Sequence, residues 1–316
     1  MLIADSGKSI YHKAFGYRNF DTKELNDTTS IFELASISKQ FTAMVIMILK
    51  EDHKLNYDDP IEKYIPGLPY NGITIRHLLN HTSGLPDYQA VMDQHWDKTK
   101  VAGNTECIEY LIKYHPAKNF DPGAKYEYSN TGYMLLASIA EKASGVDFVS
   151  FIRTLIFVPL EMTSTDIRSQ NEKAMLRTMA WGHVWIPEKN AYIRADSMIE
   201  SAYGIWLGNR KGPGRISSTT SDLLKWDQAL YKHYLVSDST LAEAFTPAKE
   251  NYGFGWVIVN TPKDGRLVWH NGDNPGYSTQ IMRYIDKNRT VIVLCNNAHT
   301  NFKELVNGVA SISNQF

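Results

Sequence analysis

Apolar residues follow a helical rhythm over one early segment of the chain. Beyond Ser36 they recur at intervals of three and four positions, at Ile37, Phe41, Met44, Val45, Ile48 and Leu49. This spacing is typical of an amphipathic helix with an apolar inner face. Ser36 lies at the predicted start of this helix, and Lys39 lies one turn further along on the same face.

The two ends of the chain carry short apolar segments bounded by turn residues, which is typical of strands. Residues 1–5 and 9–17 predict one hairpin around Ser6-Gly7-Lys8, and the C-terminal part predicts four further strands at 253–260, 266–270, 277–285 and 290–296, followed by a helix over 301–312. We therefore expect an α+β fold in which one antiparallel sheet is built from both termini.

The middle of the chain is predicted to be mainly helical. Helices are expected over 75–80 after Thr74, 105–114, 131–143 with a stop near Gly145, 147–157, 220–231 and 238–245. Residues 160–215 mix Trp, Gly and Pro without a firm pattern, and no element is predicted there. The expected division is a sheet lobe of residues 1–32 and 249–316 and a mainly helical lobe of residues 33–248.

Composition narrows the classes of partner. The chain has 316 residues, 43% hydrophobic and 21% charged, which describes a globular protein. The net charge of −1 without long runs of one sign argues against nucleic acid or an anionic membrane as partner. Cys107 and Cys295 are expected to be free thiols, and no metal or nucleotide motif is present, so no cofactor is expected.

The sequence shows no segment long and apolar enough to span a bilayer; the longest apolar run, 43–49, is far too short. The N-terminus lacks the basic segment and the following apolar stretch that are typical of a signal peptide. Because the chain opens directly on a predicted strand, a missing leader or first helix is left open.

The Ser36 segment has two interpretations. A buried lysine with a lowered pKa can take a proton from a serine hydroxyl, and free N–H groups at a helix start suit a developing oxyanion. Ser36 and Lys39 would then be a nucleophile with its activating amine. The alternative is an ordinary helix cap, because a Ser-x-x-Lys pair also occurs by chance.

Two further short motifs follow in a meaningful order: Tyr128-Ser129-Asn130 and His270-Asn271-Gly272. With the flanking stretches 32–36, 78–85, 128–133 and 270–276, nearly the whole chain resembles the serine β-lactamase and penicillin-binding protein superfamily. It looks closest to the class C-like branch, which includes D-aminopeptidases, D,D-carboxypeptidases and esterases. Tyr17-Arg18-Asn19 and Lys263-Asp264-Gly265 also fit motif patterns, but the first precedes the nucleophile and the second predicts a hairpin turn.

The resemblance implies a role for each motif residue. Ser36 would attack a carbonyl and form an acyl-enzyme, and Asn130 would hold Lys39 and a substrate carbonyl. Tyr128, deprotonated or sharing a proton with Lys39, would relay a proton to the leaving group; whether Lys39 or Tyr128 is the general base stays open. The backbone N–H groups of Ser36 and Asp273 would form an oxyanion hole, with Asn271 and Gly272 beside it on the substrate-binding strand.

His270 departs from the pattern of many β-lactamases, which carry a lysine at this position. A histidine is largely neutral near pH 7, so recognition of a substrate carboxylate by this residue is weakened. The alternative is that His270 is only structural, with the hydrogen-bonding needs of its ring met at the end of a strand. His81, in the His-Thr-Ser-Gly-Leu loop, is expected to be structural.

By this resemblance the chain is expected to be a metal-free serine hydrolase that acts by acyl transfer on a small-molecule or short-peptide substrate. D-amino-acid peptides and esters are favoured over β-lactams because of His270. Two alternatives remain, a penicillin-binding sensor or pseudoenzyme that acylates without turnover, and a non-catalytic envelope binding protein. The expected location is extracytoplasmic or periplasmic, with a cytoplasmic one left open.

Overall fold

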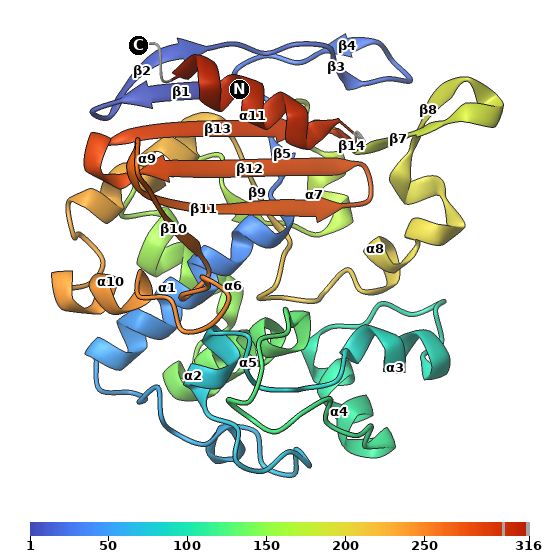
Figure 1. Ribbon diagram of the computed structural model, residues 1–316. Helices are drawn as coiled ribbons and strands as arrows, with labels where there is room; N and C mark the ends of the chain where they lie inside the picture. The colour runs from blue at the N-terminus through green and yellow to red at the C-terminus, as the bar shows by residue number, and fades with distance from the viewer. Residues whose placement is uncertain (299–300, 314–316) are drawn as a thin grey trace.

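The central element is a six-stranded antiparallel sheet in the order β10-β11-β12-β13-β1-β2 (Figure 1). The computed structural model describes residues 1–298 and 301–313. The strands are β1 (Leu2–Asp5), β2 (Lys8–His12), β10 (Val257–Thr261), β11 (Gly265–Asn274), β12 (Tyr277–Tyr284) and β13 (Arg289–Cys295). Strand β1 pairs with β13, with Ile3 opposite Val291. The prediction of one α+β fold with a sheet from both termini is confirmed.

The sheet is covered on both faces. Helix α11 (Phe302–Ser313) packs on one face through Val306 and Val309, in a cluster with Val291 and Val293. Helix α9 (Thr220–Tyr231) lies on the opposite face, where its Trp226 belongs to the main core. Because successive side chains of a strand point to opposite faces, β13 contributes to both clusters. Helix α9 thus packs on the sheet although it falls within residues 33–248, and the lobe division stays a prediction.

Helix α1 (Ser38–Glu51) crosses the molecule between the sheet and the remaining helices (Figure 1). Every residue from 38 to 49 is buried, so the expected amphipathic helix is instead buried on all sides. Two of its polar side chains find distant partners: Gln40 Oε1 accepts from Trp226 Nε1 at 3.0 Å, and Thr42 Oγ1 donates to the Gly212 carbonyl at 2.8 Å. These long-range hydrogen bonds offset part of the cost of burying polar groups, although Gln40 Nε2 is buried without a partner.

Most of the other helices follow the predicted segments: α2 (Ile75–Leu79), α4 (Asn104–Tyr114), α5 (Asn130–Ser144), α6 (Phe148–Ile152) and α10 (Asp238–Ala244). Helix α3 (Tyr88–His95) was not predicted. Thr74 caps α2 through a capping box with His77, and Gly145, at φ +74°, ends α5 as expected. The segment predicted as one helix over 147–157 is α6 followed by a π-helical turn, Arg153–Phe157.

The region without predicted elements consists of short pieces. Helices α7 (Gln170–Ala174) and α8 (Tyr203–Trp206) occur there, and β6 (Asp166–Ile167) and β9 (Ile216–Ser218) join β5 (Phe32–Glu33) in a small sheet. Strands β7 (His183–Ile186) and β8 (Ala191–Arg194) form another with β14 (Asn297–Ala298), and β3 (Tyr17–Asn19) pairs with β4 (Glu24–Leu25). Within the described residues, no helix is long and apolar enough to cross a membrane.

Candidate active site

Ser36 lies in a 3₁₀ turn, Ala35–Ile37, between β5 and α1. Ala35 is buried and adopts φ +48°, a left-handed conformation that is uncommon for a residue with a side chain. No side-chain hydrogen bond caps either this turn or α1, so the interpretation of Ser36 as an ordinary helix cap is wrong. The turn leaves the Ser36 side chain partly exposed at the start of the central helix.

Lys39 is fully buried and its amine has three polar neighbours. Nζ lies 3.1 Å from Ser36 Oγ, 2.9 Å from Asn130 Oδ1 and 3.0 Å from the Pro213 carbonyl oxygen. Burial, and secondly the positive charge of Arg210, lower the pKa of Lys39 well below its ordinary value. In the neutral amine, two N–H groups satisfy the amide and carbonyl oxygens, and the lone pair is left for the Ser36 hydroxyl.

The Tyr128 ring packs next to the Lys39 amine. Lys39 Nζ is 4.6 Å from the centroid of the Tyr128 ring, and the side chain keeps 40% of its surface exposed. The packing around its hydroxyl raises the pKa of Tyr128, although a hydrogen bond with Ser36 opposes the shift. A raised pKa favours the protonated phenol, whereas the resemblance implied a deprotonated or proton-sharing Tyr128; the role of Tyr128 stays a prediction.

Asn130 begins helix α5, directly after the N-cap residue Ser129, whose side chain accepts from the Gly132 N–H. The backbone N–H of Ser129 in turn donates to Nδ1 of His81 at 3.0 Å. His81 is fully buried, and its ring lies beneath Tyr128 with 4.3 Å between the centroids. His81 therefore supports the loop that carries Tyr128 and Asn130, as the structural interpretation expected.

His270 is buried in β11 with both ring nitrogens occupied. Nδ1 lies 2.5 Å from the Asn271 carbonyl, to which it donates, and Nε2 accepts from the Tyr252 hydroxyl at 2.9 Å. Burial, followed by the positive charge of Lys39, lowers the pKa of His270 to about 3. The ring is thus neutral, and it presents no cation to a substrate.

Strand β11 passes very close to the nucleophile turn at Gly272. A Cβ atom at this position would lie 2.2 Å from the Leu34 carbonyl oxygen and 3.0 Å from the Ser36 nitrogen, so only glycine fits. Asn271 and Asp273 alternate with it and are exposed, with Asn271 Nδ2 donating to Asp273 Oδ2 at 2.8 Å. Their side chains therefore lie on the face of β11 opposite Ser36, and only their backbone borders the site.

Sequence reasoning missed the segment 210–215, which supplies the Pro213 carbonyl to Lys39. Gly212 adopts φ +104°, and a Cβ there would lie 2.1 Å from the Tyr133 carbonyl, so the segment threads tightly past α5. The only sequence signal is the Gly212-Pro213-Gly214 run, which predicts no more than a turn. Tyr252, the partner of His270, was also missed, because a lone tyrosine carries no signature.

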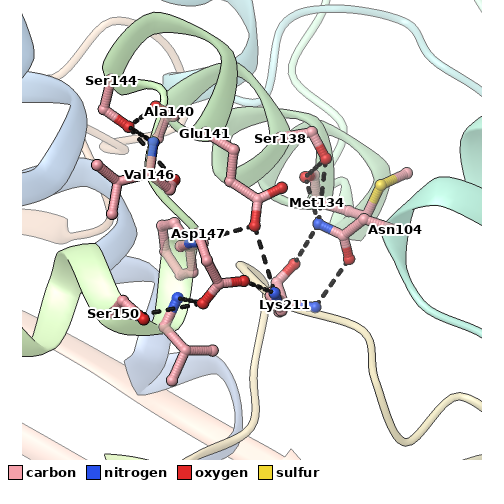
Figure 2. A network of polar contacts seen from close by, with 12 residues as sticks. Asn104, Met134, Ser138, Ala140, Glu141, Ser144, Val146, Asp147, Ser150 and Lys211 are labelled. Carbon is pink, nitrogen blue, oxygen red and sulfur yellow. Dashed lines mark hydrogen bonds and ion pairs between the residues drawn. The ribbon is translucent and has the colours of Figure 1, made fainter.

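Lys211 anchors this segment, as Figure 2 shows. Its backbone N–H donates to Asn104 Oδ1 at 2.8 Å, and its Nζ lies 2.6 Å from Asp147 and 3.3 Å from Glu141. Asn104 Nδ2 donates to the Lys211 carbonyl at 3.3 Å and to the Met134 carbonyl at 3.1 Å. Helices α4 and α5 thus hold the backbone that meets Lys39.

Across the part of the chain that the structure describes, no group of three or more His, Cys, Asp or Glu side chains is arranged to hold a metal ion. The fold and the Ser36–Lys39 pair at the start of a buried central helix define the class of serine β-lactamase and penicillin-binding proteins. Comparison with known proteins gives the family: the chain belongs to the Beta-lactamase family, whose model matches residues 1–311.

The relatives agree with this assignment. The chain is 43% identical over 303 residues to "Penicillin-binding protein 4*" of Bacillus subtilis, covering 94% of this chain and 67% of that protein. It covers only 58% of "Protein flp" of Staphylococcus aureus, to which it is 27% identical over 317 residues. The curated relatives are thus considerably longer than the chain.

Solved structures share the fold. A penicillin-binding protein from Bacillus halodurans superposes with a TM-score of 0.85 at 24% identity, covering 100% of this chain and 94% of that one. A D-amino acid amidase from Ochrobactrum anthropi SV3, complexed with L-phenylalanine, gives a TM-score of 0.77 at 21% identity, covering 99% of this chain and 91% of that one.

Proposed function

We propose that the chain is a serine hydrolase that acts by acyl transfer through a Ser36 ester, on amides or esters of small molecules or short peptides. The observation that carries the proposal is the environment of the Lys39 amine, 3.1 Å from Ser36 Oγ. Its other two neighbours, Asn130 Oδ1 and the Pro213 carbonyl, are acceptors only, so the lone pair of the neutral amine is directed to the serine hydroxyl.

The pKa shifts favour Lys39 over Tyr128 as the base of the acylation step. Burial lowers the pKa of Lys39 and raises the pKa of Tyr128, so the neutral pair is an amine and a phenol. In this mechanism Ser36 Oγ bonds to the substrate carbonyl carbon while its proton passes to Lys39 Nζ. Tyr128 then gives its proton to the leaving group and regains one from the Lys39 ammonium. Water attacks the resulting ester and the same transfers run in reverse.

The oxyanion would be stabilised by the backbone N–H groups of Ser36 and Asp273. The close approach of Gly272 to the Ser36 nitrogen supports this assignment, because it brings the strand and the turn together. Preorganised backbone donors of this kind contribute about 3 kcal/mol each to stabilisation of the transition state.

His270 supports a D-amino-acid amide, D-peptide or ester substrate over a β-lactam. Its ring is held neutral, so the third motif lacks the fixed cation that a lysine would provide for a carboxylate. The D-amino acid amidase with the same fold is consistent with this choice. We also propose a class C-like subtype and an extracytoplasmic location, in keeping with the relatives named as penicillin-binding proteins.

A hydrolysis panel tests the proposal. Nitrocefin, 4-nitrophenyl butyrate and D-alanyl-4-nitroanilide are compared as substrates of the wild type, of Ser36→Ala and of Ser9→Ala, a matched control on exposed β2. We expect ester or D-amide turnover in the wild type and in Ser9→Ala, slow nitrocefin turnover, and no turnover in Ser36→Ala.

Two outcomes would contradict parts of this account. A stoichiometric burst without turnover on all three substrates would favour a penicillin-binding sensor over a hydrolase. Fast nitrocefin hydrolysis would overturn the substrate preference drawn from His270.

A further inference from the structure

A side-chain hydrogen bond joins strand β11 to the segment that leads to the nucleophile. Alternate residues of a strand share one face, so Asn274 points to the same side of β11 as His270 and Gly272. Its Nδ2 donates to Glu33 Oε2 at 3.1 Å, and Glu33 lies three residues before Ser36. The end of β11 is therefore tied to the approach to the nucleophile turn.

A second tie lies two residues earlier along the strand. Thr279 of β12, which pairs with Gly272, donates from Oγ1 to the Leu34 carbonyl at 2.9 Å. Asp273 lies between Gly272 and Asn274, so the strand is held against the nucleophile segment on either side of Asp273. The two ties thus bracket the Asp273 backbone N–H, one of the two donors proposed for the oxyanion hole.

Glu33 is itself firmly held. It is 7% exposed, and its other oxygen lies 2.5 Å from Nζ of Lys173, a fully buried side chain of α7. Although burial alone would raise the pKa of Glu33, the charges of Lys173 and Arg215 lower it to about 2, so the carboxylate is ionised. An ionised acceptor forms a stronger hydrogen bond than a neutral one. The Asn274 amide is therefore fixed by a charged group that is itself fixed.

The turn at the end of the hairpin has its own support. Asn274 pairs with Tyr277 across a two-residue turn in which Gly276 adopts φ +79°. A Cβ on Gly276 would lie 2.4 Å from the Gly182 carbonyl carbon, so the turn rests directly on that backbone. The Tyr277 hydroxyl donates to the Ala180 carbonyl at 2.8 Å. The far side of the hairpin is thus anchored independently, and the bond of Asn274 supplies the support on the nucleophile side.

We propose that Glu33 is a positioning residue, which acts through Asn274 to hold the two donors of the oxyanion hole at the correct spacing. These donors, the N–H groups of Ser36 and Asp273, lie on different segments, so their spacing depends on ties between the segments. Such donors stabilise a transition state because they are preorganised. A buried ion pair adds little net stability, so a positional role accounts for the Glu33–Lys173 pair. The inference rests on the proposed function and adds to it a residue that acts at a distance from the reacting atoms.

Asn274→Ala tests the tie and leaves the Glu33–Lys173 pair in place. We expect kcat for 4-nitrophenyl butyrate, measured per folded chain, to fall about 10- to 100-fold while KM changes by less than about threefold, because the affected interaction is made in the transition state. Asn260→Ala is the matched control, since Asn260 is exposed on the neighbouring strand β10, and it should leave both constants unchanged. Melting curves establish the folded fraction of each variant.

A swap of the two side chains tests the partnership itself. Asn274→Asp places two carboxylates together and should lower kcat at least as much as Asn274→Ala. Adding Glu33→Gln to this variant again sets an amide opposite a carboxylate, with the net charge of the wild type. It should recover kcat by at least about fivefold, the size of coupling that residues in contact show. A residue that only supported folding would not give this recovery in kcat per folded chain.

Phenylboronic acid gives a readout that needs no turnover. Its boron binds a serine hydroxyl as a tetrahedral anion, which resembles the transition state of acyl transfer. Its Kd should rise at least about tenfold in Asn274→Ala, fall again in the double variant and stay unchanged in Asn260→Ala. Because Kd does not depend on the fraction of folded protein, this measurement keeps the test valid for a destabilised variant.

The outcomes separate this inference from the proposed function. Turnover that requires Ser36, with kcat and boronate affinity unchanged in Asn274→Ala, would overturn the positioning role and leave the hydrolase intact. Boronate binding that depends on Asn274, in a protein without turnover, would support the positioning role and reject the hydrolase. A loss in Asn274→Ala with no recovery in the double variant would reject Glu33 as the partner. Wild-type protein with neither turnover nor boronate binding would reject both.

Discussion

Gly272→Ala is the substitution that most sharply probes how strand β11 and the nucleophile turn fit together. The added Cβ would lie 2.2 Å from the Leu34 carbonyl oxygen, 2.5 Å from Thr279 Oγ1 and 3.0 Å from the Ser36 nitrogen. Even a close carbon–oxygen contact is about 3.3 Å. The strand and the turn must therefore separate by about 1 Å.

This separation has a calculable consequence for catalysis. A displacement of about 1 Å in a reacting site costs on the order of 100-fold in rate, and loss of one oxyanion donor costs about 10²–10³ in kcat. Overpacking of this kind costs about 1–3 kcal/mol of folding stability, which a domain of this size tolerates. We therefore expect a folded variant with kcat at least about 100-fold lower than that of the wild type.

The assay is kcat for 4-nitrophenyl butyrate, with unfolding in urea as the stability measurement. Gly308→Ala is the matched control, because no atom lies within 4 Å of its added Cβ on helix α11. That control should keep full activity and gain about 0.5–1 kcal/mol, since alanine is favoured over glycine within a helix. A folded Gly272→Ala protein with kcat within threefold of the wild type would refute the close fit of β11 against Ser36.

Three further predictions follow from the buried polar groups. Because the neutral amine of Lys39 is the active form, kcat/KM should rise with pH through the lowered Lys39 pKa and then level off. Arg210→Gln should move this rise to higher pH, because the positive charge that lowers the Lys39 pKa is removed. An unchanged midpoint of the pH profile would contradict the role of Arg210. Tyr252→Phe removes the donor to His270 Nε2 and should cost about 1–3 kcal/mol of folding stability in urea unfolding. The control Tyr110→Phe should cost almost nothing. Equal effects of the two substitutions would argue against the hydrogen bond between Tyr252 and His270. Burial alone would raise the pKa of Glu33, but Lys173 and Arg215 lower it from 4.5 to about 2, so the stability that ionised Glu33 contributes is complete above pH 4.5 and is lost as the pH falls towards 2. Glu33→Gln leaves Lys173 unpaired and should cost about 3–5 kcal/mol of folding stability near pH 7. A loss below about 1 kcal/mol would contradict the pairing.

Local patterns predicted the elements whose structure depends on local signals. The hairpin around Ser6-Gly7-Lys8 and the turn at Lys263-Asp264-Gly265 follow from turn chemistry, and helix α9 was predicted with its observed bounds, Thr220–Tyr231. The expectation of an amphipathic α1 was wrong, because Gln40 and Thr42 find partners far away in the sequence. Residues 160–215 were not predicted, since strands in this region pair with distant ones, as Asp166 does with Ser217 and His183 does with Asn297.

The candidate site likewise contains residues that the sequence could reveal and residues that it could not. The residues of the three motifs could be found because their side chains and order form a recognisable pattern, and the structure brings Ser36, Lys39, Tyr128 and Asn130 together. Pro213 acts through its carbonyl group, which leaves no trace in the sequence. Arg210 could not be found because its proximity to Lys39 depends on the path of the segment 210–215 across the fold.

The central claim is that the Lys39 amine makes Ser36 a nucleophile, and intact-protein mass spectrometry tests it most directly. The protein is incubated with benzylpenicillin or a fluorophosphonate, and the rate and position of covalent modification are measured in the wild type, Ser36→Ala and Lys39→Met. We predict one adduct per chain, mapped to Ser36, absent from Ser36→Ala and formed about 10²–10⁴-fold more slowly in Lys39→Met. Modification at another residue, or an undiminished rate in folded Lys39→Met, would contradict the account.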